Sequence, residues 1–286
     1  MWKADHWKEY ELIDTSDGLR LERWGGYILS RPDPQVIWHG VKKSPLWKKA
    51  DAVYERVGGG GNWTKRDVPE SWTVSYGECK FKIKPMGFKH TGLFPEQAVN
   101  WDWASSLIRE AGRPVKVLNL FAYTGGATVA AAKAGASVCH VDAAKNMVAQ
   151  AKENAALSGL SDAPIRYIVD DCKKFVEREI RRGNRYDAVI MDPPSYGRGP
   201  NGEVWKLEDN IGELIRLTAD VLSEKPLFFL VNSYTTGLSP SAMGYMLGLE
   251  MKKRFGGRVE SDEIGIPVTE TGEALPCGSS ARWTAK

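Results

Sequence analysis

The stretch VLNLFAYTGGATVAAA, residues 117–132, decides the fold class of this chain. Its first half is an apolar run as long as a buried strand, and its second half is rich in alanine with helical spacing. The two adjacent glycines between them allow a tight turn and a close approach of the backbone to a ligand, although a plain tight corner would use them equally well. A strand that turns into a helix in this way is typical of a parallel α/β sheet, whose ligands bind at the carboxyl ends of the strands.

The same alternation of strand and helix continues toward the C-terminus. Helical segments separate the strand candidates, which are residues 115–122, 137–143, 165–171, 186–192 and 227–233. Near-continuous apolar strands between helices indicate a parallel sheet covered on both faces. Residues 257–268 and 281–286 are strand-like with no helical pattern between them, so we expect a closing antiparallel pair joined by 270–280.

The first part of the chain has a different pattern, with short strands and turns over residues 10–84. A Ser-Asp-Gly turn lies at 16–18, and alternating apolar residues around 76–78 predict a hairpin. Four consecutive glycines at 58–61 predict a loop outside any strand, either a plain linker or a mobile substrate-binding loop. We therefore expect a small β-rich domain for substrate recognition over 1–87 and a larger catalytic domain over 88–286.

Composition limits the classes that remain. The chain has 286 residues, 42% of them hydrophobic, and a net charge of +3, which suits one large and one smaller globular domain. Residues 1–90 carry 16 Lys and Arg against 12 Asp and Glu, whereas the remainder carries 23 against 24. A basic front end is compatible with contact to RNA, and also with an ordinary solvated surface.

Cysteine usage and hydropathy describe the expected environment. Four scattered cysteines (Cys79, Cys139, Cys172 and Cys277) form no CxxC pair, so we expect neither a disulfide framework nor a metal site. No stretch approaches the roughly 20 apolar residues of a membrane span, and the start has no apolar core of the signal-peptide type. We expect a reduced, soluble, cytoplasmic protein with no membrane partner.

Acidic residues follow the second and third strand candidates. Asp142, followed by Ala143, ends the second strand about 20 residues after the glycine turn, which suits hydrogen bonds to the hydroxyls of a ribose. Asp170, Asp171 and Cys172 end the third strand, and a carboxylate there could accept from an adenine amino group, with Asp171 preferred over Asp170. Either strand end could instead provide the N-cap of the following helix.

The fourth strand ends in Asp192, Pro193, Pro194, Ser195 and Tyr196, which we take as the catalytic loop. Prolines donate no hydrogen bond, so the strand must stop there and its carbonyls are predicted to be free to accept from an amino group. The carboxylate adds an acceptor, and the tyrosine ring could stack on an unpaired base. The alternative is a proline-terminated loop without function.

Together, these four strand ends resemble those of a class I S-adenosylmethionine-dependent methyltransferase. The chain lacks the GxGxxG motif expected of a dinucleotide-binding dehydrogenase. The resemblance implies a Rossmann-like α/β fold with a mostly parallel seven-stranded sheet, preceded here by the small β-rich domain. It also implies S-adenosylmethionine as the cofactor.

Four segments narrow the resemblance: KHTGLFPEQ (89–97), NLFAYTGG (119–126), VDAAKNMVAQAKENAALSGL (141–160) and MDPPSYGRG (191–199). They are similar to motifs of the bacterial large-subunit ribosomal RNA methyltransferase family, over about residues 88–235. The resemblance implies an RNA partner, ribosomal RNA in particular. With the strand ends above, the candidate cofactor-binding residues are Thr91, Phe94, Gln97, Asn119, Phe121, Tyr123, Thr124, Gly125, Asp142, Ala143, Asp170, Asp171, Cys172 and Asp192.

Two departures from that family bear on the chemistry. Members that methylate carbon 5 of cytosine need a cysteine after the fifth strand, where this chain reads Asn-Ser-Tyr-Thr at 232–235. Neither serine nor tyrosine attacks a pyrimidine ring without an activating base. Ala98 also stands where the family has arginine. We therefore expect in-line methyl transfer to a nitrogen, with Cys172 as a packing residue.

Several alternatives remain open. The same cofactor site would serve a methyltransferase acting on a protein or a small molecule, or a non-catalytic cofactor-binding or RNA-interaction protein. Arg198, Lys206 and the run KKSPLWKK at 42–49 could bind phosphates, although Trp47 and Trp63 could equally be packing residues. Nothing in the sequence sets the oligomeric state.

Overall fold

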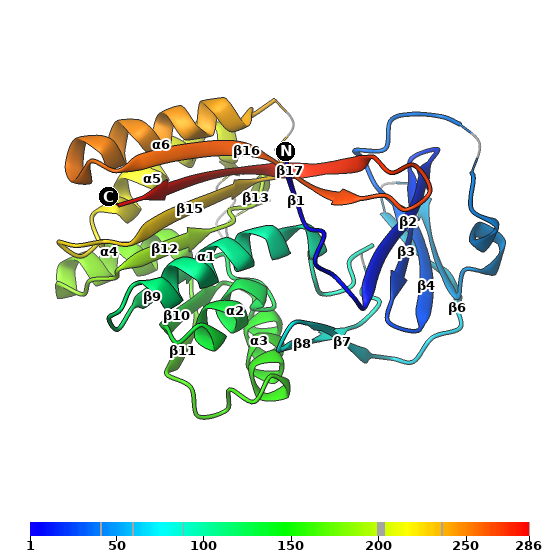
Figure 1. The fold of residues 1–286 in the computed structure, drawn as a ribbon, viewed down its shortest axis with the longest axis horizontal. Helices are drawn as coiled ribbons and strands as arrows, with labels where there is room; N and C mark the ends of the chain where they lie inside the picture. The colour runs from blue at the N-terminus through cyan, green and yellow to red at the C-terminus, as the bar shows by residue number, and fades with distance from the viewer. Residues whose placement is uncertain (41, 59, 88, 199–203, 236, 286) are drawn as a thin grey trace. The chain divides into compact units, whose positions relative to one another are not determined.

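The computed structural model describes residues 1–40, 42–58, 60–87, 89–198, 204–235 and 237–285, which form two compact units (Figure 1). The N-terminal unit contains Met1–Val99 and Gly265–Cys277, and the C-terminal unit contains Asn100–Ile264 and Gly278–Lys286. The boundary expected between residues 87 and 88 therefore lies inside the N-terminal unit. The last two strands of the chain each contribute residues to both units.

The C-terminal unit is built on the expected mostly parallel sheet. The sheet has eight strands, one more than expected, in the order β1-β16-β17-β15-β12-β9-β10-β11, because the short β1 (Trp2–Lys3) of the N-terminal unit pairs with β16. The pairs from β15 through β12, β9 and β10 to β11 are all parallel, and β17 is antiparallel to β15. The strands are β9 (Lys116–Leu120), β10 (Ser137–Asp142), β11 (Ile165–Val169), β12 (Ala188–Met191), β15 (Phe228–Ser233), β16 (Arg258–Pro267) and β17 (Ala274–Thr284).

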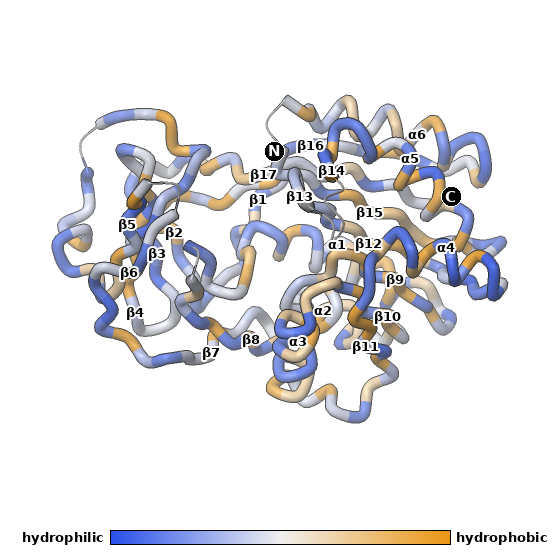
Figure 2. The backbone as a smooth tube through the Cα atoms, turned by 180° about the vertical axis from the view of Figure 1, so that it is seen from behind, coloured by the Kyte–Doolittle hydropathy of each residue, from blue (hydrophilic) through white to orange (hydrophobic). Residues whose placement is uncertain are grey.

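Helices cover both faces of this sheet, as near-continuous apolar strands require. They are α1 (Ala98–Glu110), α2 (Gly126–Lys133), α3 (Lys145–Leu157), α4 (Cys172–Arg182), α5 (Leu207–Ala219) and α6 (Pro240–Phe255). Consecutive strand residues enter different cores: Val117 packs with α1 and α2, whereas Leu118 packs with α4, α5 and α6. Figure 2 shows the resulting apolar colouring of the central strands.

The closing antiparallel pair is present but longer than expected. β17 begins at Ala274, so most of the segment 270–280, expected to be a connection, is strand. Ser279 and Ser280 pair with the end of β15, which extends the ladder through polar residues that period-2 hydropathy does not mark. A further short pair, β13 (Tyr196–Arg198) with β14 (Val204–Lys206), follows the predicted catalytic loop.

The N-terminal unit contains a five-stranded sheet in the order β2-β3-β4-β5-β6 and the predicted hairpin β7–β8. Ala4 N–H donates to Gly265 O where β1 meets β16 inside this unit. Its elements are β1 (Trp2–Lys3), β2 (Tyr10–Ser16), β3 (Leu19–Trp24), β4 (Tyr27–Pro32), η1 (Pro45–Lys49), β5 (Ala52–Val57), β6 (Gly60–Arg66), β7 (Trp72–Tyr76), β8 (Cys79–Ile83) and η2 (Pro95–Gln97).

The glycine run at 58–61 corrects one expectation. Gly60 and Gly61 belong to β6 and pair with Val57 and Arg56, so half of the run is strand and not loop. A Cβ on Gly61 would lie 2.6 Å from the ring of Tyr54 and 2.4 Å from the carbonyl of Glu55. The glycine is therefore needed for the close approach of an aromatic ring within the sheet. Gly59 lies outside the described residues.

A buried charge cluster, defined as Tyr10, Arg20, Glu22, Arg31 and Asp33, forms the interior of the N-terminal unit. Glu22 is fully buried and accepts from Tyr10 Oη at 2.8 Å and from Arg31 Nη2 at 2.9 Å, and Arg31 Nε also donates to it. Arg20 lies 3.4 Å from both Glu22 and Asp33. Burial would raise the pKa of Glu22, but the charges of Arg20 and Arg31 outweigh it and lower that pKa to about 2.

Replacing Glu22 by glutamine is expected to destabilise the N-terminal unit strongly. Breaking a buried ion pair from one side leaves an uncompensated charge and costs about 3–5 kcal/mol. The lowered pKa means that the stabilisation is present above the ordinary glutamate value of 4.5 and is lost as the pH falls from there toward 2. Urea denaturation of both proteins across this range measures both effects.

Glu70→Gln is the matched control. Its side chain is 80% exposed and pairs with Lys84 at the surface, so we expect little change in stability. If Glu22→Gln unfolded at the same urea concentration as Glu70→Gln, the buried charge cluster would not support this unit.

Candidate active site

The pairing register brings three predicted strand ends to one edge of the sheet. Val141 and Met191 both pair with Leu120, one from each side. Phe121, Asp142 and Asp192 come directly after Leu120, Val141 and Met191, so they lie at the ends of three adjacent strands. The carboxyl edge of a parallel sheet is where ligands of such folds bind.

The turn between β9 and α2 has an unusual backbone. Phe121 and Tyr123 have positive φ angles of 53° and 50°, and Gly125 has a φ of 83°. Positive φ is uncommon for residues with a side chain and costs on the order of 1 kcal/mol or more. Such strain is held at functional sites, so the outliers support the sequence-based choice of this turn.

The two glycines of the turn are also needed for packing. A Cβ on Gly125 would lie 2.8 Å from the Cβ of Ala151 in α3, and one on Gly126 would lie 2.5 Å from the Trp101 ring in α1. The glycines are thus required for a tight turn, and this requirement is compatible with a close approach of the backbone to a ligand. Asn154 Nδ2 adds a hydrogen bond to the carbonyl of Thr124 at 2.8 Å, which fixes this buried residue within the turn.

Asp142 ties this turn to the next one. Its Oδ2 accepts from Tyr123 N–H and its Oδ1 from Ala144 N–H, both at 2.8 Å. The helix N-cap position itself falls on Ala144, which makes no side-chain cap. Each carboxylate oxygen keeps an acceptor site beyond its backbone bond, so the side chain fits two neighbouring hydroxyls of a ribose. Ala143, the next predicted residue, is exposed at the same strand end.

Asn119 belongs to a buried polar chain that the sequence analysis missed. Its amide donates to Thr128 Oγ1 at 2.9 Å, and Thr128 lies 2.9 Å from His140 Nδ1. Burial lowers the pKa of His140 to about 4, so the imidazole is neutral at pH 7. The available signal in the sequence was a polar residue, Asn119 or His140, within each of two otherwise apolar strands. The register pairs these two residues with each other. Asn119 is 3% exposed, and its part in the cofactor site remains a prediction.

At the end of β11, the structure shows the alternative role, in which a carboxylate caps the following helix. Asp171 is the N-cap of α4 and accepts from Lys174 N–H at 2.9 Å. Asp170 pairs with Arg178 and accepts from Asp171 N–H. Asp171 remains exposed, so a bond to an adenine amino group stays a prediction beside the observed cap.

Cys172 has a structural position, as expected. It is 3% exposed, and its sulfur accepts from Phe121 N–H at 3.2 Å and donates to Val141 O at 3.7 Å. Burial raises the pKa of this thiol well above its usual range. The other three cysteines are buried too. An inert thiol thus braces the ends of β9 and β10.

The predicted catalytic loop follows β12, and one expectation about it is wrong. The carbonyl of Pro194 is not free, because it accepts from Trp205 Nε1 at 2.7 Å. The same indole lies 6.4 Å from the ring of Phe121, so Trp205 joins this loop to the β9 turn. Nothing in the local sequence marked Trp205, which lies beyond the undescribed residues 199–203.

The remaining loop residues lie as follows. Asp192 is half-buried, Pro193 is buried and Ser195 is half-buried, with the Ser195 carbonyl accepting from Leu207 N–H at 3.1 Å. Tyr196 is 52% exposed. A rigid, partly exposed loop at a strand end can therefore present a carboxylate and an aromatic ring to a planar substrate.

Three predicted cofactor residues, Thr91, Phe94 and Gln97, belong to the N-terminal unit, so their part in the cofactor site remains a prediction. The buried charge cluster holds their segment, since Arg31 Nη1 donates to Lys89 O at 3.0 Å. Burial lowers the pKa of Lys89 to about 8 and that of His90 to about 4.

No helix in the described part of the chain is long and apolar enough to cross a membrane. Within those same ranges, no group of three or more His, Cys, Asp or Glu side chains could hold a metal ion.

The sheet order, the strained glycine turn and the carboxylate after β10 define a Rossmann-like methyltransferase fold. A family model described as S-adenosylmethionine-dependent methyltransferase matches residues 52–232, and the chain belongs to this family. It is thus a methyltransferase that uses S-adenosylmethionine. A solved S-adenosylmethionine-dependent methyltransferase from Agrobacterium tumefaciens is 40% identical, with a TM-score of 0.91 over 98% of this chain and 91% of that one.

More distant relatives have narrower names. A ribosomal RNA large subunit methyltransferase K/L from Shewanella frigidimarina is 34% identical over 56% of this chain and 22% of its own length. A putative ribosomal RNA large subunit methyltransferase from Methanocaldococcus jannaschii is 33% identical over 66% of this chain and 51% of its own. The chain thus spans about half or less of these relatives. The structure of SMU.776, a putative methyltransferase complexed with SAH, shares the fold at 20% identity and a TM-score of 0.72.

Asp142→Ala is expected to weaken S-adenosylmethionine binding at least tenfold in calorimetry. Hydrogen bonds to a charged group contribute about 1.5–3 kcal/mol, and tenfold corresponds to about 1.4 kcal/mol. Asp162→Ala, at an exposed turn of the same unit, should bind like the wild type. Equal affinities for the two variants would remove Asp142 from the cofactor site.

Proposed function

We propose that this methyltransferase acts on a base of RNA, with ribosomal RNA as the substrate and a nitrogen of the base as the acceptor. The observation that carries the proposal is the loop after β12. It places Asp192 beside the β9 turn in the register and exposes the ring of Tyr196. The two relatives named above, whose names refer to ribosomal RNA, support the choice of substrate.

The loop is suited to hold a flat base. Trp205 Nε1 donates to the Pro194 carbonyl, and Tyr196 of β13 pairs with Lys206 of β14, so both described sides of the loop are hydrogen-bonded. The Asp192 carboxylate would accept from an amino group of the base, while the Tyr196 ring stacks on it. A base within a duplex must leave the stack to reach such a loop, so the substrate is an unpaired or flipped nucleotide.

S-adenosylmethionine supplies an already activated methyl group, so the work of the protein is chiefly to position the acceptor. A nitrogen with its own lone pair needs no covalent help from the enzyme. Carbon 5 of a pyrimidine does, through a thiolate. All four cysteines are buried, and none lies in the loop after β12.

The last residues of β15, near the position where a carbon-5 enzyme of the resembling family has its cysteine, have other partners here. Asn232 Oδ1 accepts from Asn100 Nδ2 at 3.0 Å and from Ser280 Oγ at 2.6 Å. Arg282 completes this buried network through Asn100. These groups support the sheet and the start of α1, which favours nitrogen over carbon as the acceptor.

The test of the substrate is transfer of labelled methyl from S-adenosylmethionine to ribosomal RNA from a strain lacking the gene, followed by mass analysis of the nucleosides. We expect label in one base methylated on nitrogen. A 5-methylcytidine product would contradict the choice of nitrogen. Absence of label in RNA, with the cofactor bound, would point to a protein or small-molecule acceptor.

Asp192→Asn is expected to lower the rate of transfer by roughly 100-fold, because loss of a positioning contact of this kind costs about that factor. Cofactor affinity, measured by calorimetry, should change little. An equal loss of affinity would make Asp192 a cofactor ligand or a structural residue instead. Asp209→Asn, at an exposed residue of α5 in the same unit, is the control.

A further inference from the structure

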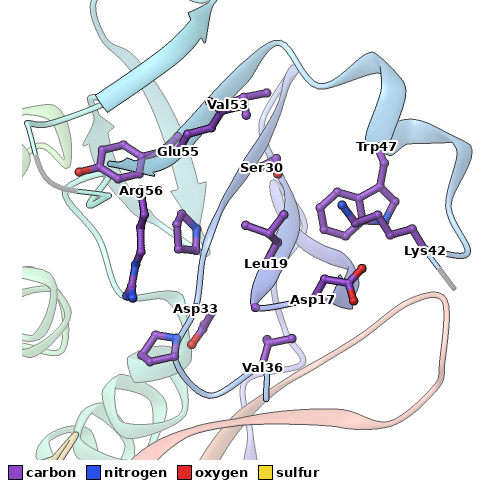
Figure 3. Close-up of a pocket in the computed structure, with 14 residues that line it drawn as sticks. Asp17, Leu19, Ser30, Asp33, Val36, Lys42, Trp47, Val53, Glu55 and Arg56 are labelled. Atoms are coloured by element: carbon purple, nitrogen blue, oxygen red, sulfur yellow. The ribbon is translucent and has the colours of Figure 1, made fainter. Parts of the chain in front are cut away.

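The N-terminal unit contains a pocket that the proposed function does not use. Its volume is about 710 Å³, within the range of roughly 300–1,000 Å³ typical of small-molecule sites. The lining comes from the turn between β2 and β3, from β3, β4 and β5, and from the connection between β4 and β5 (Figure 3). Leu19, Val36 and Val53 contribute apolar surface, and Tyr54 adds an aromatic side chain.

Two cations line the pocket from different segments. Figure 3 shows Lys42 with Trp47 on one side and Arg56 of β5 on the other. Lys42 Nζ lies 4.6 Å from the centre of the Trp47 ring, so its charge rests on the indole face. Lys42 and Arg56 are both exposed. A negatively charged ligand could contact both without displacing the core.

The segment that carries Lys42 and Trp47 is fixed by a buried carboxylate. Asp14 is 1% exposed, and its Oδ2 accepts from Lys43 N–H, Ser44 N–H and Trp47 Nε1 at 2.8, 3.1 and 2.8 Å. Three bonds to one buried oxygen hold the loop and the indole in place. The segment that carries Lys42 and Trp47 is therefore preorganised, which lowers the entropic cost of binding a ligand there.

Segment 42–49, which contributes Lys42 and Trp47 to the lining, carries an excess of positive charge. The four lysines of 42–49 account for the whole excess of basic over acidic residues in 1–90. Lys48 and Lys49 end η1 and are exposed. In the described part of the chain, none of Lys42, Lys48, Lys49 and Arg56 forms an ion pair. Cations beside aromatic side chains, as Lys42 is beside Trp47, are typical of single-stranded nucleic-acid sites.

Carboxylates in the lining restrict the ligand further. Asp17 lies 3.2 Å from His39 Nδ1, and Asp33 lies 3.4 Å from Arg20 Nη1, and both retain acceptor sites. Exposed Glu55 adds a third carboxylate. A simple polyanion would be repelled by these groups. A nucleotide carries both a phosphate for the cations and, in cytosine, adenine or guanine, an amino group for the carboxylates.

We propose that this pocket binds one nucleotide of a single-stranded RNA segment, with the base against the carboxylates and the flanking phosphates on Lys42, Lys48, Lys49 and Arg56. The site deepens the proposed function, on which it rests, by giving the N-terminal unit a defined role in holding the substrate. Cytosine, adenine and guanine should bind better than uracil, which offers no amino group.

The test measures binding of a short fluorescein-labelled single-stranded RNA to the full chain by anisotropy at several salt concentrations. Each phosphate contact contributes about 0.7 to the slope of log affinity against log salt. Lys48→Gln/Lys49→Gln should therefore weaken binding about tenfold and lower the slope by about 1.4. Arg56→Gln should weaken binding and lower the slope by about 0.7.

Lys252→Gln/Lys253→Gln is the matched control, because these adjacent exposed lysines end α6 and lose the same charge. Its affinity should equal that of the wild type. Asp17→Asn tests the base contact and should reduce the preference for oligocytidine over oligouridine. Circular dichroism and cofactor affinity confirm that each variant is folded.

Two results would overturn the proposal. One is an unchanged affinity and slope in Lys48→Gln/Lys49→Gln. The other is binding with no base preference that inorganic polyphosphate displaces equally well, which would mark a general polyanion surface. If the wild type methylates RNA but these variants bind it normally, only the pocket proposal fails. If the binding effects appear without RNA methylation under any condition, only the proposed function fails.

Discussion

The parallel pairing of β9 with β10 on one side and β12 on the other is the constraint on which the site depends. Because Val141 and Met191 share the partner Leu120, the residues that follow all three strands meet at one edge. The turn after β9 then has to reverse direction within a few residues while packing against α1 and α3. The positive φ angles of Phe121 and Tyr123 and the two glycines satisfy this requirement.

Carboxylates that bind backbone N–H groups recur in both units. Asp142 links the β9 turn to the start of α3, and Asp14 holds the lysine-rich segment in the N-terminal unit. Glu22 orients Arg31, which in turn donates to the carbonyl of Lys89. In each case a carboxylate on a strand holds a loop in place, directly or through an arginine, so the sheets determine the positions of these loops.

The sequence predicted the fold well because apolar periodicity and strand-end residues are local signals. The parallel sheet, the β7–β8 hairpin and the SAM-dependent family were all predicted from such patterns. The extent of β17 and the strand pairing of Gly60 and Gly61 were not, since both depend on a partner strand. Trp205 and His140 were missed for the same reason: their roles come from contacts distant in sequence.

Because β16 and β17 contribute to both units, the order in which the chain is synthesised affects how the units fold. The N–H groups of Thr269 and Glu270 donate to the carbonyls of Leu12 and Ile13, so β2 is bonded to a segment more than 250 residues later in the sequence. On the ribosome, N-terminal domains ordinarily fold as soon as they emerge. Here the N-terminal unit stays incomplete until residue 277 has been synthesised, and its completion coincides with that of the catalytic sheet. Formation of both units thus depends on the same pair of strands, β16 and β17.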